Sequence, residues 1–185
     1  MNDDASSSRR NLLLGVGGAG LLAAGLAASS PRTAAQGTDA LTTQDISLAQ
    51  AQAIVEAAIA ASHDKGLAMD IAVLDAGANL KAFARMDGAW LGSIDIAIKK
   101  ARTARFFNFP TGAIGELSQP GGPLYQIEVS NGGLITFPGG VPLMAADGTV
   151  IGAVGVSGST VEDDHAVGTA GAAALGGLNM ATPTS

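Results

Sequence analysis

The sequence contains no cysteine, and only two histidines, one tryptophan and one tyrosine occur among its 185 residues. Without cysteine there is no disulfide framework, no thiolate metal site and no cysteine nucleophile. Two histidines are too few for a histidine-rich zinc site. The shortage of large aromatic rings also argues against a stacking platform for single-stranded nucleic acid. The fold must therefore be held together by packing alone.

Common functional motifs are missing as well. The sequence has no P-loop, no dinucleotide-binding fingerprint and no recognisable Ser-His-Asp order. The protein has a formal net charge of −6, which would repel the phosphate backbone of a nucleic acid, so no nucleic-acid partner is expected. What the chain does have is 47% hydrophobic residues, enough for the core of one domain.

The first 35 residues are typical of a twin-arginine signal peptide. Ser8-Arg9-Arg10-Asn11 precedes an apolar stretch at 12–28 that five glycines dilute, so the stretch is too weakly hydrophobic for a secure membrane anchor. Thr33-Ala34-Ala35 offers small residues for a signal peptidase. We expect cleavage before Gln36, a periplasmic or secreted protein, and no stable membrane anchor afterwards. An uncleaved N-terminal helix is the alternative.

The rest of the chain predicts an α+β domain over residues 47–180, after a flexible segment at 36–46. Helices are expected from Ser47 to Gly66, at 93–107, at 111–117 and from Thr160 onward, and strands at 68–74, 80–86, 134–137, 141–145 and 149–157. Ser47 with Gln50, and Ser159 with Glu162, stand at capping-box spacing before the first and last helices. Short hairpin connections favour a five-stranded antiparallel sheet with helices on one side.

Two clusters of charged side chains are candidates for a ligand site. Arg85-Met86-Asp87 lies at the end of a predicted strand, where strands lead into the loops that commonly carry sites, although Arg85 and Asp87 are equally suited to pair with each other at the surface. Lys99 and Lys100 belong to a basic helix face suited to a haem propionate, a carboxylate substrate or an acidic subunit. A solvated face, with Asp95 paired to Lys99 within the helix, is the simpler interpretation.

A third cluster suits a metal ion. Glu162-Asp163-Asp164-His165 combines carboxylates with an imidazole at a helix start, where acidic residues also complement the helix macrodipole. The other histidine, His63, lies near the end of the first helix and is typical of a surface residue there. The candidate metal ligands are His63, Asp95, Glu162 and His165.

Five segments, in this order and spacing, resemble the GlcG/HbpS family, which also supplies the C-terminal domain of PduO-type adenosyltransferases. The segments are Ile71-Ala72-Val73-Leu74-Asp75-Ala76-Gly77, Arg85-Met86-Asp87-Gly88-Ala89, Lys99-Lys100-Ala101-Arg102-Thr103-Ala104, Gly139-Gly140-Val141-Pro142 and Val150-Ile151-Gly152-Ala153-Val154-Gly155-Val156-Ser157-Gly158. The resemblance covers roughly residues 41–178. It implies a profilin-like five-stranded antiparallel sheet flanked by helices, homo-oligomers from dimer to octamer and, for secreted members, binding of haem or iron.

The resemblance also implies roles for individual residues. His63 would be the axial donor to haem, because some relatives use a histidine, while Arg85, Lys99 and Lys100 would neutralise the propionates. With Asp87 these residues form the expected cofactor-binding set. Two positions depart from the secreted haem-binding member. A threonine that contacts the haem iron corresponds to Leu134, and an acidic pair linked to iron corresponds to Asp95 and Ile98.

Two other functions fit the same residues. The protein could bind or transform a small organic acid, with Arg85 and Lys100 holding the carboxylate and Asp87 acting as acid or base. It could also be an oligomeric scaffold without a ligand. The sequence assigns no catalytic residue.

Overall fold

The structure is a computed structural model that describes residues 41–179. The predicted signal peptide at 1–35 lies outside the described residues, as does the first part of the predicted flexible segment, 36–40. The elements follow in the order α1 (Leu48–Asp64), β1 (Asp70–Asp75), β2 (Leu80–Arg85), α2 (Leu91–Phe107), α3 (Thr111–Leu117), a 3-10 turn η1 (Ile127–Val129), β3 (Gly140–Met144), β4 (Val150–Ser157) and α4 (Val161–Asn179).

The strands form one antiparallel sheet in the order β2-β1-β4-β3. The α+β class is confirmed, but the prediction of five strands is wrong, since the described residues form four. Residues 134–137 are not a strand because their backbone donors bind elsewhere. The Leu134 N–H donates to the Glu128 carbonyl at 2.9 Å, and the Ile135 N–H donates to the Thr103 hydroxyl on α2 at 3.1 Å. Only after Pro138 does the chain join the edge of β4 as β3.

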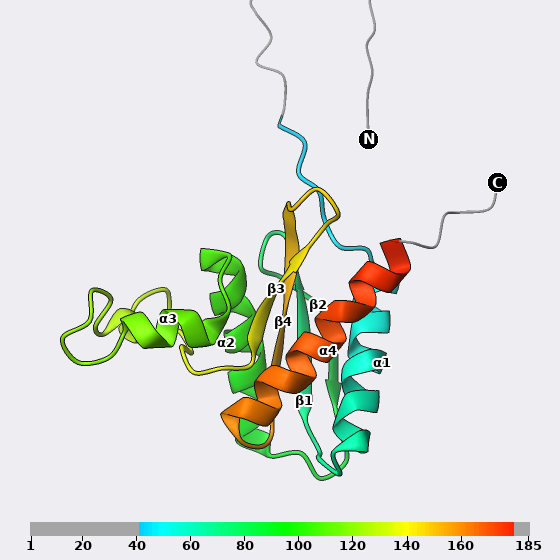
Figure 1. The fold of residues 1–185 in the computed structure, drawn as a ribbon, viewed down its shortest axis with the longest axis horizontal. Helices are drawn as coiled ribbons and strands as arrows, with labels where there is room; N and C mark the ends of the chain where they lie inside the picture. Colours follow the sequence, from blue (N-terminus) through cyan, green and yellow to red (C-terminus); the bar gives the residue numbers. More distant parts are fainter. Residues whose placement is uncertain (1–40, 180–185) are drawn as a thin grey trace, which may run out of the picture. The chain divides into compact units, whose positions relative to one another are not determined.

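Helices cover both faces of the sheet, not one face as predicted. Alternate residues of a strand point to opposite faces. Ile71 and Val73 of β1 therefore pack in a core with α1 and α4, whereas Ala72 and Leu74 pack against α2. Figure 1 shows α1 and α4 side by side on one side of the strands and α2 on the other. Every residue from Asp70 to Leu74 is buried as a result.

The α2 face is packed through very small residues. A Cβ atom added to Gly155 on β4 would lie 2.1 Å from the Ala97 carbonyl oxygen and 2.4 Å from the Ala101 nitrogen, both on α2. Glycine is therefore required where the helix crosses this strand. This close crossing fixes α2 against the sheet and determines which of its side chains are enclosed.

The starts of α1 and α4 are fixed by side-chain caps. The Ser47 hydroxyl accepts the Gln50 N–H at 3.2 Å, and the Gln50 side chain accepts the Ser47 N–H at 3.0 Å, which confirms the first capping box. The second prediction is one residue out of place. The Thr160 hydroxyl, not that of Ser159, accepts the Asp163 N–H at 3.2 Å. Within 41–179, no helix is both long and apolar enough to cross a membrane.

Candidate functional site

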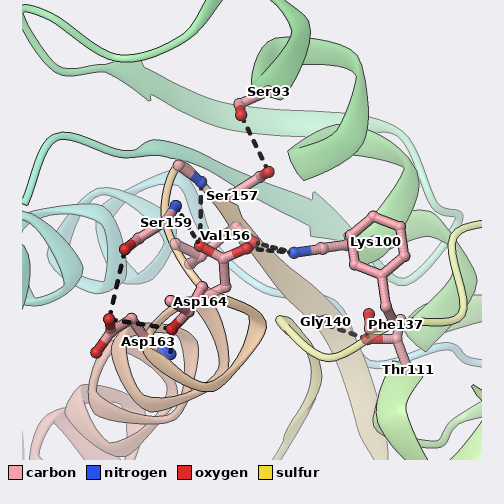
Figure 2. Close-up of polar contacts among 12 residues, drawn as sticks. Ser93, Lys100, Thr111, Phe137, Gly140, Val156, Ser157, Ser159, Asp163 and Asp164 are labelled. Carbon is pink, nitrogen blue, oxygen red and sulfur yellow. Dashed lines mark hydrogen bonds and ion pairs between the residues drawn. The ribbon is translucent and has the colours of Figure 1, made fainter.

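Lys100 is enclosed in the protein and does not extend the basic surface expected from the sequence. Its side chain is 0% exposed. Its Nζ donates to Asp164 Oδ2 at 2.6 Å and to the Val156 carbonyl at 3.0 Å. Figure 2 shows the lysine reaching from α2 across the end of β4 toward α4. An ammonium held this way is not available to a haem propionate or a dissolved carboxylate, which corrects the role predicted for Lys100.

Asp164 is the internal partner of this lysine. Its second oxygen, Oδ1, accepts the backbone N–H groups of Gly158 and Ser159 at 3.0 and 3.1 Å. Burial raises the pKa of the Asp164 carboxyl and lowers the pKa of the Lys100 ammonium, while their mutual attraction acts against both shifts. The Phe137 ring lies over the same ammonium, with its centroid 4.7 Å from Nζ. These contacts tie α2, the β4–α4 turn and the loop before β3 into one rigid unit.

The acidic start of α4 does not assemble into a metal site. No group of three or more possible metal ligands occurs within the described part of the chain. Asp164 is bound to Lys100, Asp163 is paired with Lys65 at 2.9 Å, and Glu162 is exposed. Asp95, another predicted metal ligand, forms the expected ion pair with Lys99 at 2.8 Å within α2. Of the four predicted ligands, Glu162 and His165 share α4, whereas His63 lies on α1 and Asp95 on α2, so the four do not form one cluster.

His63 and Asp87 do come together. They line a surface hollow of about 450 Å³, here called the His63 hollow, with Gly66, Leu67, Ala68 and Met86. His63 is exposed in the last turn of α1, and Met86 follows β2. The Met86 sulfur already accepts the Met69 N–H, at 3.4 Å. Arg85 is next in sequence, but its guanidinium donates to the Ala89 carbonyl at 3.0 Å.

Lys99 does not belong to this group. Lys99 belongs to α2, which packs on the face of the sheet opposite to α1. The Lys99 Nζ lies close to Gly133, because a Cβ atom added to that glycine would be 3.6 Å from it. Of the predicted cofactor-binding residues, the structure thus brings His63 and Asp87 together, whereas Arg85 does not line the hollow. Lys99 and Lys100 lie elsewhere. Leu134, at the position of the iron-contacting threonine, is buried with 4% of its surface exposed.

A second imidazole lines a hollow that the sequence reasoning did not anticipate. His165 on α4 meets α3 and the loop before β3 around about 280 Å³, here called the His165 hollow, lined by Pro110, Gly112, Ala113, Glu116, Pro138 and His165. In the sequence, Pro110 and Pro138 mark only the boundaries of elements. These segments meet His165 because α4 packs beside them in the folded chain, and no local sequence pattern indicates that contact.

Asp70 is a second residue that the sequence reasoning missed. It starts β1, is 0% exposed, and neither carboxylate oxygen has a hydrogen-bond partner within the described structure. Its neighbours across the sheet are Arg85 on β2 and Ser157 on β4. Burial raises the pKa of this carboxyl, and the charge of Arg85 partly offsets the shift. A buried carboxyl without a partner costs stability when it ionises.

Comparison with known proteins identifies relatives for almost the whole described domain. Residues 46–173 match the family described as "Haem degrading protein HbpS-like". The chain is 39% identical over 121 residues to an uncharacterised 15.0 kDa protein encoded between dhaT and dhaS in Citrobacter freundii, covering 65% of this chain and 84% of that protein. It is also 32% identical to the corrinoid adenosyltransferase PduO of Salmonella typhimurium, of which it spans only 36%.

Solved structures agree with these matches. The crystal structure of Klebsiella pneumoniae protein ORFY superposes with a TM-score of 0.72 at 34% identity, covering 75% of this chain and 95% of that one. The crystal structure of a PduOC:haem complex superposes with a TM-score of 0.67 at 30% identity, covering 70% and 94%. The sequence motifs, the sheet with helices on both faces and these matches lead to one conclusion: the chain belongs to the HbpS-like family.

Proposed function

We propose that this protein binds haem. The observation that carries the proposal is its membership of the HbpS-like family over residues 46–173, together with the haem complex solved for the related PduOC domain. The chain's own residues must still offer what haem requires. These requirements are an axial donor for the iron, an apolar surface for the macrocycle and an environment that tolerates two carboxylates.

The residues present fit the first two requirements. Without cysteine, the common axial donors to haem iron that this chain retains are histidine, methionine and tyrosine. Both histidines line surface hollows, of about 450 Å³ for His63 and about 280 Å³ for His165. Hollows that hold small molecules span about 300–1,000 Å³, so a haem bound in either would stay partly in water. Solvent can then hydrate the propionates where no cation reaches them.

Bound haem would supply the redox and oxygen chemistry of its iron. The protein's part would be to hold the iron through an imidazole and to cover one face of the macrocycle with apolar side chains. At the His63 hollow, Leu67 and Ala68 provide that cover. At the His165 hollow, Pro110, Ala113 and Pro138 provide it.

The organic-acid alternative receives no support from the geometry. It needs Lys100 to join Arg85 in holding a carboxylate, but Lys100 is enclosed and bound to Asp164. Arg85 alone remains exposed near Asp87. We therefore place haem binding ahead of organic-acid binding and assign no catalytic residue.

A haemin titration tests the proposal. Protein lacking residues 1–35 is titrated with haemin and followed by difference absorption in the Soret region, with bovine albumin and buffer as references for nonspecific binding. We expect a saturable shift with an end point near one haemin per chain. A spectrum that stays identical to that of free haemin, at every protein concentration, would refute the proposal.

We further propose that the protein is exported as a folded, self-associating unit. The twin-arginine motif at Arg9 and Arg10 supports export, and exposed apolar side chains such as Trp90, Leu91 and Met144 support self-association. Mass spectrometry of exported protein should give an N-terminus at Gln36, and replacing both arginines with lysine should retain the protein in the cytoplasm.

Self-association is tested separately. Light scattering should give a mass of at least two chains. A monomer at micromolar concentration would contradict self-association.

A further inference from the structure

The His165 hollow adjoins two more hollows around the short helix α3. One, of about 480 Å³, shares Gly112, Glu116 and Pro138 with it and extends to Phe137. The other, of about 250 Å³, shares Ala113 and is lined otherwise by Phe107, Phe109, Ile114, Leu117 and Leu124. The helix is thus surrounded by hollow, largely apolar surface, with an imidazole on its α4 side.

Apolar side chains around α3 are unusually open to water. Phe109 is 60% exposed, Leu117 46% and Phe137 40%. Exposed apolar side chains that gather around one short helix mark an interaction site more often than singly scattered ones do. The Phe137 ring is also held in place from behind by the buried Lys100 ammonium. A planar apolar ligand would find a preformed wall here.

The His165 imidazole is held more firmly than that of His63. It directly follows the first turn of α4, which Thr160 caps and Asp164 anchors through Lys100 and two backbone N–H groups. Its Nδ1 is enclosed and has no hydrogen-bond partner within the described structure. That leaves Nε2 as the nitrogen able to meet a ligand in the hollow. His63, by contrast, is exposed at the end of α1.

Each hollow has one carboxylate in its lining, but the other side chains of the two linings differ. Asp87 contributes a carboxylate to the His63 hollow, and the Met86 sulfur there is engaged by the Met69 N–H. In the His165 hollow Glu116 is the one carboxylate, and the walls opposite are Pro110 and Pro138. Glu116 disfavours a propionate nearby, so this hollow suits the apolar body of a macrocycle better than its acidic edge.

We infer that His165, not His63, is the axial donor when this protein binds haem, with the macrocycle resting on α3, Pro138 and Phe137. The inference rests on the proposed function, since it assigns the donor for the same ligand. It differs from the donor expected from the sequence, His63, and uses a residue of α4.

Four proteins lacking residues 1–35 test the assignment: the unsubstituted protein, His165→Ala, His63→Ala as the matched control, and Gly112→Ala. Each is titrated with haemin, and the Soret maximum and the electron paramagnetic resonance spectrum of the ferric form are recorded. Free imidazole is then added to each complex. The Cβ introduced by Gly112→Ala would stand 3.0 Å from the Pro138 ring, which narrows the hollow without removing a donor.

We expect His165→Ala to shift the Soret maximum and the iron spin state and to weaken binding at least tenfold, with added imidazole restoring the original spectrum. His63→Ala should match the unsubstituted protein, and Gly112→Ala should weaken binding while keeping the axial signature. An unchanged spectrum for His165→Ala, or an equal change in both histidine variants, would overturn the assignment. Failure of the unsubstituted protein to bind haemin would instead refute the proposed function.

Discussion

The buried ion pair between Lys100 and Asp164 gives a quantitative prediction. Removing one member of a buried pair typically costs about 3–5 kcal/mol, because the remaining charge stays in the interior without compensation. Lys100→Met and Asp164→Asn should therefore each lower the free energy of unfolding by about that much. The amide introduced by Asp164→Asn keeps an oxygen for the Gly158 and Ser159 N–H groups, so the loss in this variant reports mainly the stranded ammonium.

The double variant separates the pair from its surroundings. When Lys100→Met and Asp164→Asn are combined, neither charge remains, and replacing a buried pair by uncharged side chains of similar size is often close to neutral. The loss of unfolding free energy in the double variant should thus be smaller than the sum of the two single losses, by at least about 2 kcal/mol. It also remains informative if a single variant fails to fold.

Urea unfolding at pH 7, followed by far-ultraviolet circular dichroism, supplies the three free energies. The slope of free energy against urea should stay equal among variants, which indicates that the same surface is exposed on unfolding. Single losses below about 1 kcal/mol, or losses that simply add, would show that the pair is not buried and coupled as the 2.6 Å contact indicates.

Three further predictions concern stability. Asp70→Asn should stabilise the protein at pH 7. Burial raises the pKa of the Asp70 carboxyl above its ordinary value of 3.8. The unfolded chain therefore ionises first as the pH rises above 3.8, and the folded protein loses stability until the pH has passed the raised pKa. Asparagine does not ionise, so its advantage in urea unfolding should grow as the pH rises above 3.8, and a constant difference would contradict the reasoning. Gly155→Ala should prevent folding or cost more than about 3 kcal/mol, since its Cβ would meet the Ala97 carbonyl, whereas Gly92→Ala on the open side of α2 should gain about 0.5–1 kcal/mol. Equal effects of the two alanines would refute the close helix–strand crossing. Thr160→Ala should cost about 1 kcal/mol and Ser159→Ala less, because Thr160 caps α4, and thermal denaturation that ranks them in the reverse order would contradict that cap.

Much of the fold could be predicted because local patterns determine it. The Ser47–Gln50 capping box, the hairpin of β1 and β2, and α3 at 111–117 all occur where the sequence indicates. Residues 134–137 have strand-like composition, but their hydrogen bonds are accepted by the Thr103 side chain on α2 and by the Glu128 carbonyl of η1, which no local pattern reveals.

The site was harder to predict because its residues meet only through tertiary packing. For Lys100 a signal did exist, since it lies three residues after Ala97 and four before Ala104, within the apolar stripe of α2. Its neighbour Lys99 and the basic composition of the helix obscured that signal. For His165 no signal existed, because its neighbours Pro110, Glu116 and Pro138 come from distant segments that α4 reaches only in the folded chain.

The absorption spectrum of the protein isolated from the periplasm of an expressing bacterium supplied with haem precursors tests the central claim most directly. We predict a Soret band that travels with the protein through gel filtration, at about one haem per chain, and that is lost from the His165→Ala protein. Correctly processed protein that absorbs only in the ultraviolet band of its aromatic side chains and takes up no haemin afterwards would contradict haem binding.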